Sequence, residues 1–550
     1  GGDKLYVEDV FSTYLYTGTG ATLSIVNDID LDGEGGLVWV KSRDTVTYHH
    51  LTDTERGANK DIYSNDISAQ FTETEALKVF NSNGFTIGTQ GQYNTNGEDY
   101  ASWTFRKAPG FFDVVTYTGN GVVGRTVAHN LGSVPGFIVV KRLDTANHWS
   151  AYHRSLGNAQ QVWLDRTADA GGSGTWDSTT PTDTEFTLSN GASVNFNGGT
   201  YVAYLFAHDV QEFGSDGDES VIKCGSLNNS TPAVLGWEPS FIITKRIDAD
   251  ADWYILDAMR GLTVEDAGIQ YLETNTTNAE AASGGSVGML INSQGFSTGN
   301  NGTYIYIAIR RPMKTPEAGT EVYNNLANRI GTSAAATISG VGFAVDLMIP
   351  FAENTGSSKP FVDRLRGATK YLLPPYTNAE QTTTDAVTSF ASNDGVLVGA
   401  DASLQVINNY YNSSRRYAAS FFKRATGFMD VVCYTGTGSP ANYNHNLGVV
   451  PEMMITRART GSNNWFVYNA DKGNNFVVYL NSDYSGGTDG GYRWNQTTPT
   501  ASVFTNGTNA GSSGSGVPFV AYLFATLDGV SKVGSYTGTG ADLNVDCGFT

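Results

Sequence analysis

Three alternating aspartates near the start of the chain have the types and spacing of metal ligands. Residues 28–33 read Asp-Ile-Asp-Leu-Asp-Gly, which matches the first half of a calcium loop, where hard oxygen ligands converge on one cation. The twelfth position is Trp39, where an EF-hand loop needs a bidentate Glu. A polar sheet edge, with the two aliphatic residues facing inward, explains the same pattern. The sequence favours that explanation, and Asp28, Asp30 and Asp32 remain the candidates for a calcium cofactor.

Two of the seven histidines occur in the same tetrapeptide, His-Asn-Leu-Gly, at His129 and His445. A repeated histidine could be a metal ligand or a general base. No acid or serine recurs beside both, so the pattern indicates a turn that enters a strand. The sequence shows no G-x-S-x-G elbow, and context singles out no Ser/His/Asp set. We therefore predict no catalytic residues and no enzyme.

Tryptophans are the other candidates for binding. Trp149, Trp253 and Trp465 each lie 14 residues after a proline, and this fixed spacing favours a core anchor over a sugar-stacking platform. Trp176 and Trp494 each open a polar loop rich in threonine and proline. Because a flat ring can stack on the apolar face of a sugar, these two are the candidate glycan-binding residues. The alternative is that each indole pins its loop.

These residues lie in a chain that repeats itself. The pentapeptide Tyr-Thr-Gly-x-Gly occurs with spacings of 101, 317 and 102 residues, at Tyr16, Tyr117, Tyr434 and Tyr536. The long gap has room for two more unit starts, which we place near Leu227 and Ile330. The period of about 100 residues is the size of a domain that buries its own core. We therefore expect beads on a string rather than a continuous superhelix.

A higher order relates the first three units to the last three. The His129 tetrapeptide recurs at His445 and the Trp176 loop at Trp494, with offsets of 316 to 318 residues. The predicted domains are residues 1–115, 116–212, 213–313, 314–432 (a divergent unit), 433–530 and 531–550 (the start of a sixth unit). We expect a duplicated triplet within a longer parent chain.

Inside a unit the pattern is that of β-structure. Residues 137–142, Phe-Ile-Val-Val-Lys-Arg, predict a largely buried strand, and a polar turn and an aromatic-led strand follow it. This order is typical of a β-hairpin. Long amphipathic helices are hard to find. The sequence predicts an all-β fold of tandem antiparallel β-sandwich domains, jelly-roll-like and about 100 residues each.

Composition limits the classes of molecule that the chain is expected to bind. The chain has 34 basic and 54 acidic residues, a net charge of −20, which disfavours nucleic acid and anionic membranes. No run of 18 apolar residues occurs, so we expect no membrane insertion. Cys224, Cys433 and Cys547 show no CxxC spacing, and a disulfide framework or zinc site is not indicated.

The units resemble a family of β-rich repeat domains of marine bacteriophage tail-fibre and virion structural proteins. The residues that carry the resemblance are 14–20, 35–43, 53–58, 101–113 and 129–135. The resemblance implies a virion component and does not fix which part of the particle it forms. We expect a location on the surface of the extracellular particle. It implies no catalytic residues.

Three hypotheses follow. The first is a tail-fibre or host-attachment protein that is homo-oligomeric, contacts other virion proteins and binds host surface glycans weakly. The second is a capsid-surface decoration or structural protein. The third is a glycan-active enzyme with repeated binding modules. It would need acids in the divergent fourth unit, and those to examine are Asp346, Glu353, Asp363 and Glu380.

Overall fold

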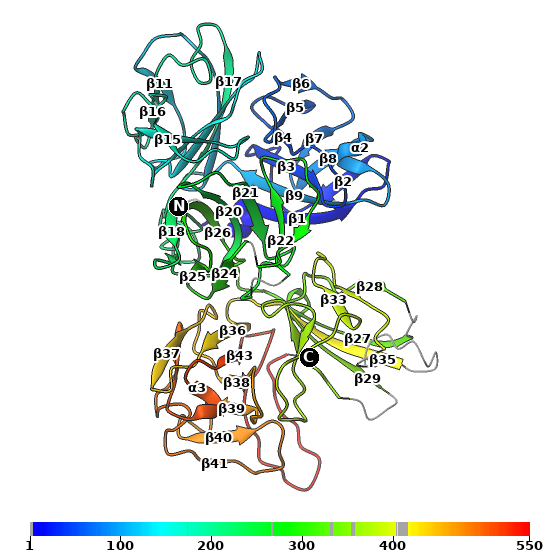
Figure 1. The fold of residues 1–550 in the computed structure, drawn as a ribbon. Helices are drawn as coiled ribbons and strands as arrows, with labels where there is room; N and C mark the ends of the chain where they lie inside the picture. The colour runs from blue at the N-terminus through cyan, green and yellow to red at the C-terminus, as the bar shows by residue number, and fades with distance from the viewer. Residues whose placement is uncertain are drawn as a thin grey trace.

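The computed structural model describes residues 4–172, 174–265, 268–285, 287–330, 334–353, 358–402, 404 and 416–549. These residues form five β-sandwich units built of antiparallel strands, so the predicted all-β class is confirmed. Figure 1 shows units 1 to 3 grouped at one end and units 4 and 5 at the other. Each unit has a large sheet and a small one.

The large sheets of units 1 to 3 each contain six strands in the same order. Unit 1 has β1 (Phe11–Thr17), β9 (Asp99–Arg106), β3 (Gly36–Ser42), β4 (His50–Asp53), β5 (Lys60–Tyr63) and β6 (Phe71–Thr72). Unit 2 has β10 (Phe112–Thr118), β17 (Thr200–Phe206), β12 (Phe137–Arg142), β13 (Ser150–His153), β14 (Gln160–Trp163) and β15 (Gly171–Gly172). Unit 3 has β18 (Ile222–Asn228), β26 (Thr303–Arg310), β20 (Pro239–Arg246), β21 (Trp253–Asp257), β22 (Gln270–Glu273) and β23 (Ala281–Ala282).

Unit 5 repeats this order, and unit 4 keeps it over four strands but has its last two strands as a separate pair. Unit 5 has β36 (Met429–Thr435), β43 (Pro518–Phe524), β38 (Met453–Ala458), β39 (Phe466–Asn469), β40 (Phe476–Tyr479) and β41 (Gly487–Thr488). Unit 4 has β27 (Tyr323–Ile330), β35 (Arg416–Phe422), β29 (Leu347–Ala352) and β30 (Val362–Asp363), with a separate pair, β31 (Lys370–Tyr371) and β32 (Gln381–Thr382). Unit 4 is therefore divergent in structure, as in sequence.

A small sheet completes each sandwich. The small sheet of unit 1 has β2 (Leu23–Val26), β8 (Gly84–Ile87) and β7 (Leu77–Asn81), and that of unit 2 has β11 (Arg125–Ala128) and β16 (Glu185–Leu188). Unit 3 has β19 (Ala233–Val234), β25 (Gly295–Thr298) and β24 (Met289–Asn292), and unit 4 has β28 (Ala336–Ile338), β34 (Val396–Val398) and β33 (Val387–Ser389). Unit 5 has β37 (Ala441–Asn444) and β42 (Val503–Asn506). The helices are α1 (Val7–Val10), α2 (Gly91–Asn94), η1 (Gly319–Glu321) and α3 (Ala510–Ser513). Within the described residues, no helix has the length and apolar character to cross a membrane.

The Tyr-Thr-Gly-x-Gly signal ends the first strand of a unit. The predicted boundaries after residues 115 and 432 therefore fall inside β10 and β36. In unit 2, the Tyr117 hydroxyl donates to the Val194 carbonyl over 2.7 Å and its ring stacks on Tyr201, while Gly121 has a φ of 69°. Tyr16 and Tyr434 make the same bond, to Tyr93 and Ser512. The repeated motif is thus explained by the turn that it makes.

Gly119 lies in a turn that packs closely against the backbone of Phe196. A Cβ there would be 2.2 Å from the Phe196 carbonyl oxygen. We expect Gly119→Ala to destabilise unit 2 by about 1–3 kcal/mol, because the backbone must shift to admit the methyl group. Gly172→Ala is the control, since nothing lies within 4 Å of its Cβ. Urea unfolding of both variants checks this, and equal losses would contradict it.

The expectation of beads on a string is wrong. All residues of β3 and β12 are buried, because these central strands are covered on both faces. Val38 and Val40 pack with Ile87 of the small sheet in the core of unit 1. Leu37 and Trp39, which point to the opposite face, belong to a second core that units 1, 2 and 3 share.

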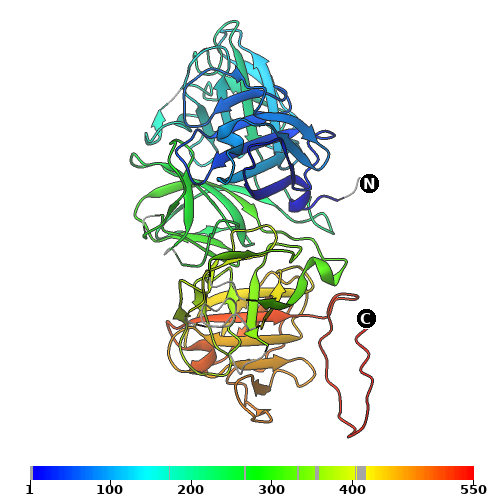
Figure 2. The same cartoon turned by 90° about the vertical axis from the view of Figure 1, so that its right-hand side faces the viewer.

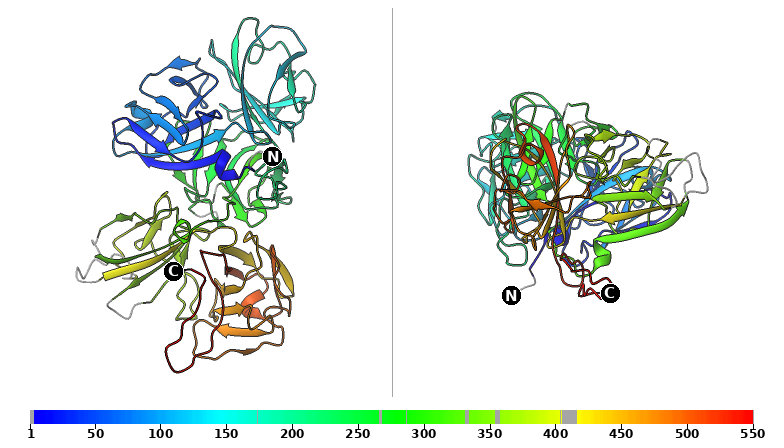
Figure 3. Two further views of the ribbon diagram at one scale, coloured as in Figure 1. Left: turned by 180° about the vertical axis from the view of Figure 1, so that it is seen from behind. Right: turned by 90° about the horizontal axis from the view of Figure 1, so that it is seen from below.

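Aromatic rings from three units meet in this shared core. Phe105 of unit 1 lies 5.5 Å from Phe206 of unit 2 and 5.8 Å from Phe241 of unit 3, centroid to centroid. Phe137 of unit 2 lies 6.2 Å from Trp253 of unit 3. Each unit therefore contacts the other two, and we call units 1 to 3 the closed triangle. Figure 3 shows the same grouping from behind.

Two main-chain hydrogen bonds recur at four of the seams between units. In each case a backbone amide donates to a backbone carbonyl across the seam. The first pair is Gln70 to Leu143 with Asn147 to Ile67, and the second is Ala170 to Ile247 with Ala251 to Thr167. The third pair is Glu280 to Arg43 with Thr47 to Thr277, and the fourth is Glu380 to Arg459 with Asn463 to Thr377. The first three pairs join units 1 and 2, 2 and 3, and 3 and 1. The fourth joins units 4 and 5, which we call the open pair. The open pair thus repeats one seam of the triangle.

Candidate functional site

The three aspartates at the calcium-like sequence lie on a polar edge. Asp28 and Asp32 are exposed, and Asp30 accepts a hydrogen bond from the Gly33 amide over 2.8 Å. Ile29 and Leu31 are buried at 0% and 1% exposure. The structural explanation therefore accounts for the pattern. Over the described ranges, no group of three or more His, Cys, Asp or Glu side chains is placed to hold a metal ion.

Trp176 and Trp494 do not offer sugar platforms. Each is 1% exposed and meets a tyrosine edge to face at 5.8 Å, Tyr152 for Trp176 and Tyr468 for Trp494. The Trp494 indole N–H donates to the Phe476 carbonyl. A ligand cannot reach either ring face, so the glycan-binding assignment of these two residues is corrected: they pin their loops from the core.

His129 and His445 hold identical turns. In each, Nδ1 accepts from the backbone amide two residues on, that of Leu131 or Leu447, and Nε2 faces a threonine carbonyl. Burial lowers the pKa of both imidazoles. These contacts require the neutral ring with its proton on Nε2, which is a structural role.

The acids of unit 4 neutralise arginines. Asp363 lies 2.6 Å from Arg366 Nε and Glu380 lies 2.8 Å from Arg366 NH1, while Asp346 lies 3.3 Å from Arg364 Nε. Glu353 directly follows β29. The structure therefore places three of the four candidate acids in ion pairs rather than facing each other across a cleft.

The structure reveals a different repeated cluster, an Asp-x-x-Arg pair at the end of the second hairpin strand. Its three copies are Asp53 with Arg56, Asp257 with Arg260, and Asp363 with Arg366. In each copy the aspartate accepts from both the amide and Nε of the arginine. The arginine also donates to a main-chain carbonyl five residues earlier. All six side chains are at most 2% exposed.

Each Asp-x-x-Arg pair receives a side chain from the neighbouring unit. The Tyr204 hydroxyl of unit 2 donates to Asp53 over 2.8 Å. The Trp103 indole of unit 1 donates to Asp257 over 3.1 Å, and the Tyr522 hydroxyl of unit 5 donates to Asp363 over 2.8 Å. The Asp-x-x-Arg spacing occurs three times in the sequence, at residues 53–56, 257–260 and 363–366, but only the structure shows that the pairs are buried between units. The pairs fix how units meet, because a buried charge pair tolerates little displacement.

The fixed-spacing tryptophans complete the seams. The Trp149 indole donates to the Tyr63 carbonyl of unit 1, and the Trp253 indole donates to the Trp163 carbonyl of unit 2, both over 2.9 Å. Beside them, Lys141 and Lys245 donate to neighbouring-unit carbonyls, those of Ile67 and Thr167. Burial lowers the pKa of both lysines to about 8. Shifted pKa values often mark active sites, but here they come from packing between units.

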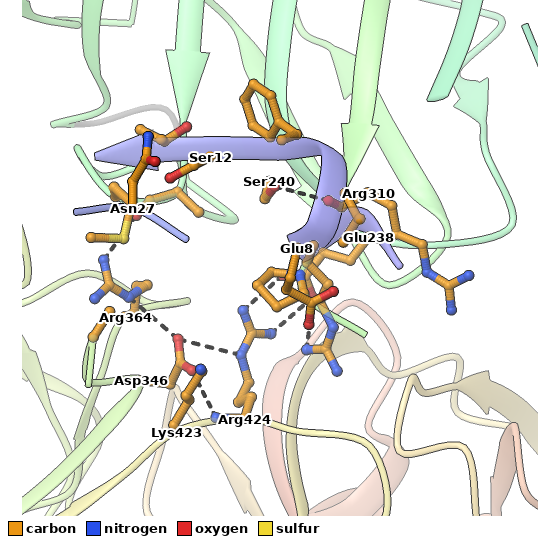
Figure 4. Close-up of a pocket in the computed structure, with 18 of the residues that line it drawn as sticks. Glu8, Ser12, Asn27, Glu238, Ser240, Arg310, Asp346, Arg364, Lys423 and Arg424 are labelled. Atoms are coloured by element: carbon orange, nitrogen blue, oxygen red, sulfur yellow. Dashed lines mark hydrogen bonds and ion pairs between the residues drawn. The ribbon is translucent and has the colours of Figure 1, made fainter. Parts of the chain in front are cut away.

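A cavity of about 280 Å³ lies where units 1, 3 and 4 meet. Figure 4 shows charged side chains from units 3 and 4 pointing toward each other at its edge. The Arg424 guanidinium donates hydrogen bonds to both carboxylate oxygens of Glu238, over 2.9 and 2.8 Å. Its backbone amide donates to Asp346 over 2.7 Å. Arg311 of unit 3 pairs with Asp430 of unit 5 at 2.8 Å.

Four buried charged side chains at or beside this cavity are paired with opposite charges. Glu238, Arg424, Arg311 and Asp430 are each at most 9% exposed and each has an oppositely charged partner. Burial acts against the charge on Asp430, but Arg311 and Arg424 hold its pKa below the usual range. Such a network binds the closed triangle to the open pair. These paired charges favour holding two layers together over acid–base chemistry.

In a comparison with known families, residues 7–311 and 320–550 match the model of a domain of unknown function (DUF7483). The chain belongs to the DUF7483 family. Together the two segments include all five units, so the repeat is a property of the matched region. No curated protein matches this DUF7483 chain.

The seam between units 2 and 3 of the DUF7483 chain should weaken in mild acid. His153 Nε2 lies 3.1 Å from the Tyr306 carbonyl and His208 Nδ1 accepts from the Cys224 amide. Burial lowers the pKa of both histidines from 6.5 to about 4. Because the unfolded chain binds more protons below pH 6.5, the contribution of these two histidines to stability should be constant above pH 6.5 and fall from there to about pH 4.

The fully buried His153 should contribute a slope of up to about 1.4 kcal/mol per pH unit in that window. His153→Asn is the matched variant, since unit 5 carries Asn469 at the equivalent position. Urea unfolding between pH 7 and pH 4.5 measures the difference between the two chains, in which carboxylate effects cancel. A difference that does not change with pH would contradict this assignment.

Proposed function

We propose that the chain is a structural, non-catalytic component of a bacteriophage virion, exposed on the particle surface as part of a tail fibre for host attachment. The observation that carries the proposal is the layered packing: a closed triangle of units followed by an open pair joined to it end to end (Figure 1). Like units added in layers build length. The sequence resemblance to virion repeat domains supports the same role.

The seams suit a stiff spacer. Each seam combines main-chain hydrogen bonds with buried aromatic rings, and the triangle and the open pair are tied by the Glu238–Arg424 pair. A homo-oligomer of such rods, assembled with other virion proteins, would present each surface several times. Multivalent presentation raises the avidity of a weak site without new contacts.

Host surface glycans are the ligand that we propose for this presentation. Since Trp494 is buried, the accessible ring in its loop is Tyr492, which is 62% exposed. A glycan array probed with the chain and with Tyr492→Ala tests the idea. Binding that the variant loses supports it, and absence of binding by the parent chain would reduce the role to scaffolding.

Electron microscopy of purified particles with an antibody against the chain tests the location. Labelling along the tail is the expected result. Labelling confined to capsid faces would replace the fibre by a decoration protein, and unlabelled particles would overturn the virion proposal. Depolymerisation of a host polysaccharide by the purified chain would overturn the non-catalytic role.

A further inference from the structure

The open pair leaves only partly buried an apolar face that the closed triangle buries. Strand register aligns the two: Leu37 pairs with Phe105 in unit 1 as Leu347 pairs with Phe422 in unit 4. Phe105 is 0% exposed, whereas Phe422 is only half-buried. The same contrast separates Phe206 of unit 2, at 3% exposure, from its half-buried counterpart Phe524 in unit 5.

Alternation within the central strands points to the same face. In β29, Leu347 and Met348 are buried, but Ile349 and Phe351, on alternate positions, are not. The corresponding strand of unit 1, β3, is buried at every residue. In unit 5, Met453 is half-buried where unit 2 has the buried Phe137. A large sheet with one apolar face partly open is a place for another protein surface.

Unit 3 is what covers this face in the triangle. Its Phe241 lies 4.9 Å from Phe11 and 5.8 Å from Phe105 of unit 1, and its Trp253 lies 6.2 Å from Phe137 of unit 2. Units 4 and 5 meet through the same kind of seam as units 1 and 2. The partly open face is therefore continuous with an established interface.

The chain itself carries the opening residues of such a unit. Residues 532–536, Lys-Val-Gly-Ser-Tyr, parallel residues 223–227, Lys-Cys-Gly-Ser-Leu, which form most of β18. In β18, Cys224 and Leu227 are buried at 0% and 2% exposure. Tyr536, in contrast, is 72% exposed, and residues 532–549 belong to no strand. Figure 2 shows this red stretch extended away from the open pair.

We propose that the face formed by units 4 and 5 is the docking site of a third β-sandwich unit of the same repeat. The first strand of this unit begins at Lys532, and the unit packs on units 4 and 5 as unit 3 packs on units 1 and 2 in the closed triangle. The occupant buries Phe422, Met453 and Phe524 and turns the open pair into a second triangle. This inference does not depend on where the protein works.

A graft within the full chain tests the proposal. Residues 532–550 are replaced by residues 223–313, so that a second copy of unit 3 follows unit 5 through the matching lysine. Met453 is the reporter, because oxidation of a methionine to its sulfoxide is read by mass spectrometry. We expect peroxide to oxidise Met453 at least about tenfold more slowly in the graft. The buried Met454, which lies outside the duplicated residues 223–313, should react as before.

The control graft carries Phe241→Ala and Trp253→Ala in the added unit only, which removes the rings that cover the face. Met453 should then oxidise as fast as in the unmodified chain. Equal rates in the chain and the first graft, with amide exchange showing the added unit folded, would overturn the proposal. A second result would also overturn it: in the unmodified chain, Met453 becomes protected as the protein concentration rises, and sedimentation shows a dimer at the same concentrations. A second copy of the chain would then be the occupant. If the graft does not fold, urea unfolding of Phe105→Ala and Phe422→Ala in the unmodified chain decides, because equal losses of stability would show that the face is already covered.

Discussion

Replacing Asp257 by alanine should lower the unfolding free energy of the closed triangle by about 3–5 kcal/mol, because the buried Arg260 guanidinium loses its closest anion. Both side chains are 0% exposed, with 2.7 Å between Arg260 Nε and the carboxylate. Asp257 also accepts from the Trp103 indole of unit 1. Glu280 remains 3.1 Å from Arg260 NH1, which keeps the expected loss toward the lower part of that range.

The matched control is Asp248→Ala in the same unit. Asp248 pairs with Arg246 at 2.7 Å, but the two side chains are 42% and 34% exposed, so the loss should stay below about 1 kcal/mol. Urea unfolding followed by tryptophan fluorescence measures both variants. Hydrogen exchange should place the damage of Asp257→Ala in β9 and β21, on the two sides of the seam. Similar losses in the two variants would show that the pair does not anchor the seam.

The strands were predictable because local chemistry dictates them. Residues 137–140 are apolar at consecutive positions, and the buried strand predicted over residues 137–142 is confirmed as β12, with all six residues buried. A run of this kind predicts that both faces of the strand are covered, but it does not predict which parts of the protein cover them. One face meets the small sheet of its own unit and the other meets two neighbouring units. The expectation of separate beads failed on that second surface.

The candidate sites show the same limit. Burial of Trp149, Trp253 and Trp465 was predicted and is confirmed at 0%, 1% and 0% exposure. Spacing could not reveal that the indoles of Trp149 and Trp253 donate across seams, since that depends on how units dock. The Asp-x-x-Arg pairs were the signal available. Three copies of a charged pair in a chain with few charges indicate buried partners, and such partners are needed where surfaces meet.

Replacing Phe105 by alanine should cost the closed triangle about 3–5 kcal/mol, because it opens a cavity where three units meet. The ring is 0% exposed and lies within 5.8 Å of Phe11, Phe206 and Phe241, centroid to centroid. No single unit can close such a gap by itself. The variant should therefore lower the unfolding midpoints of units 1, 2 and 3 together.

Phe422→Ala is the matched variant in the open pair, at the same position of the last strand of unit 4. Its ring is half-buried and its nearest aromatic contact is Tyr323 at 5.0 Å, so the loss should be only about 1–2 kcal/mol. Urea unfolding of the two variants, with hydrogen exchange to separate the triangle from the open pair, measures the contrast. In the graft that adds a third unit, the loss from Phe422→Ala should rise toward that from Phe105→Ala. Equal losses in the unmodified chain would mean that the face of the open pair is already covered, and the docking site would be excluded.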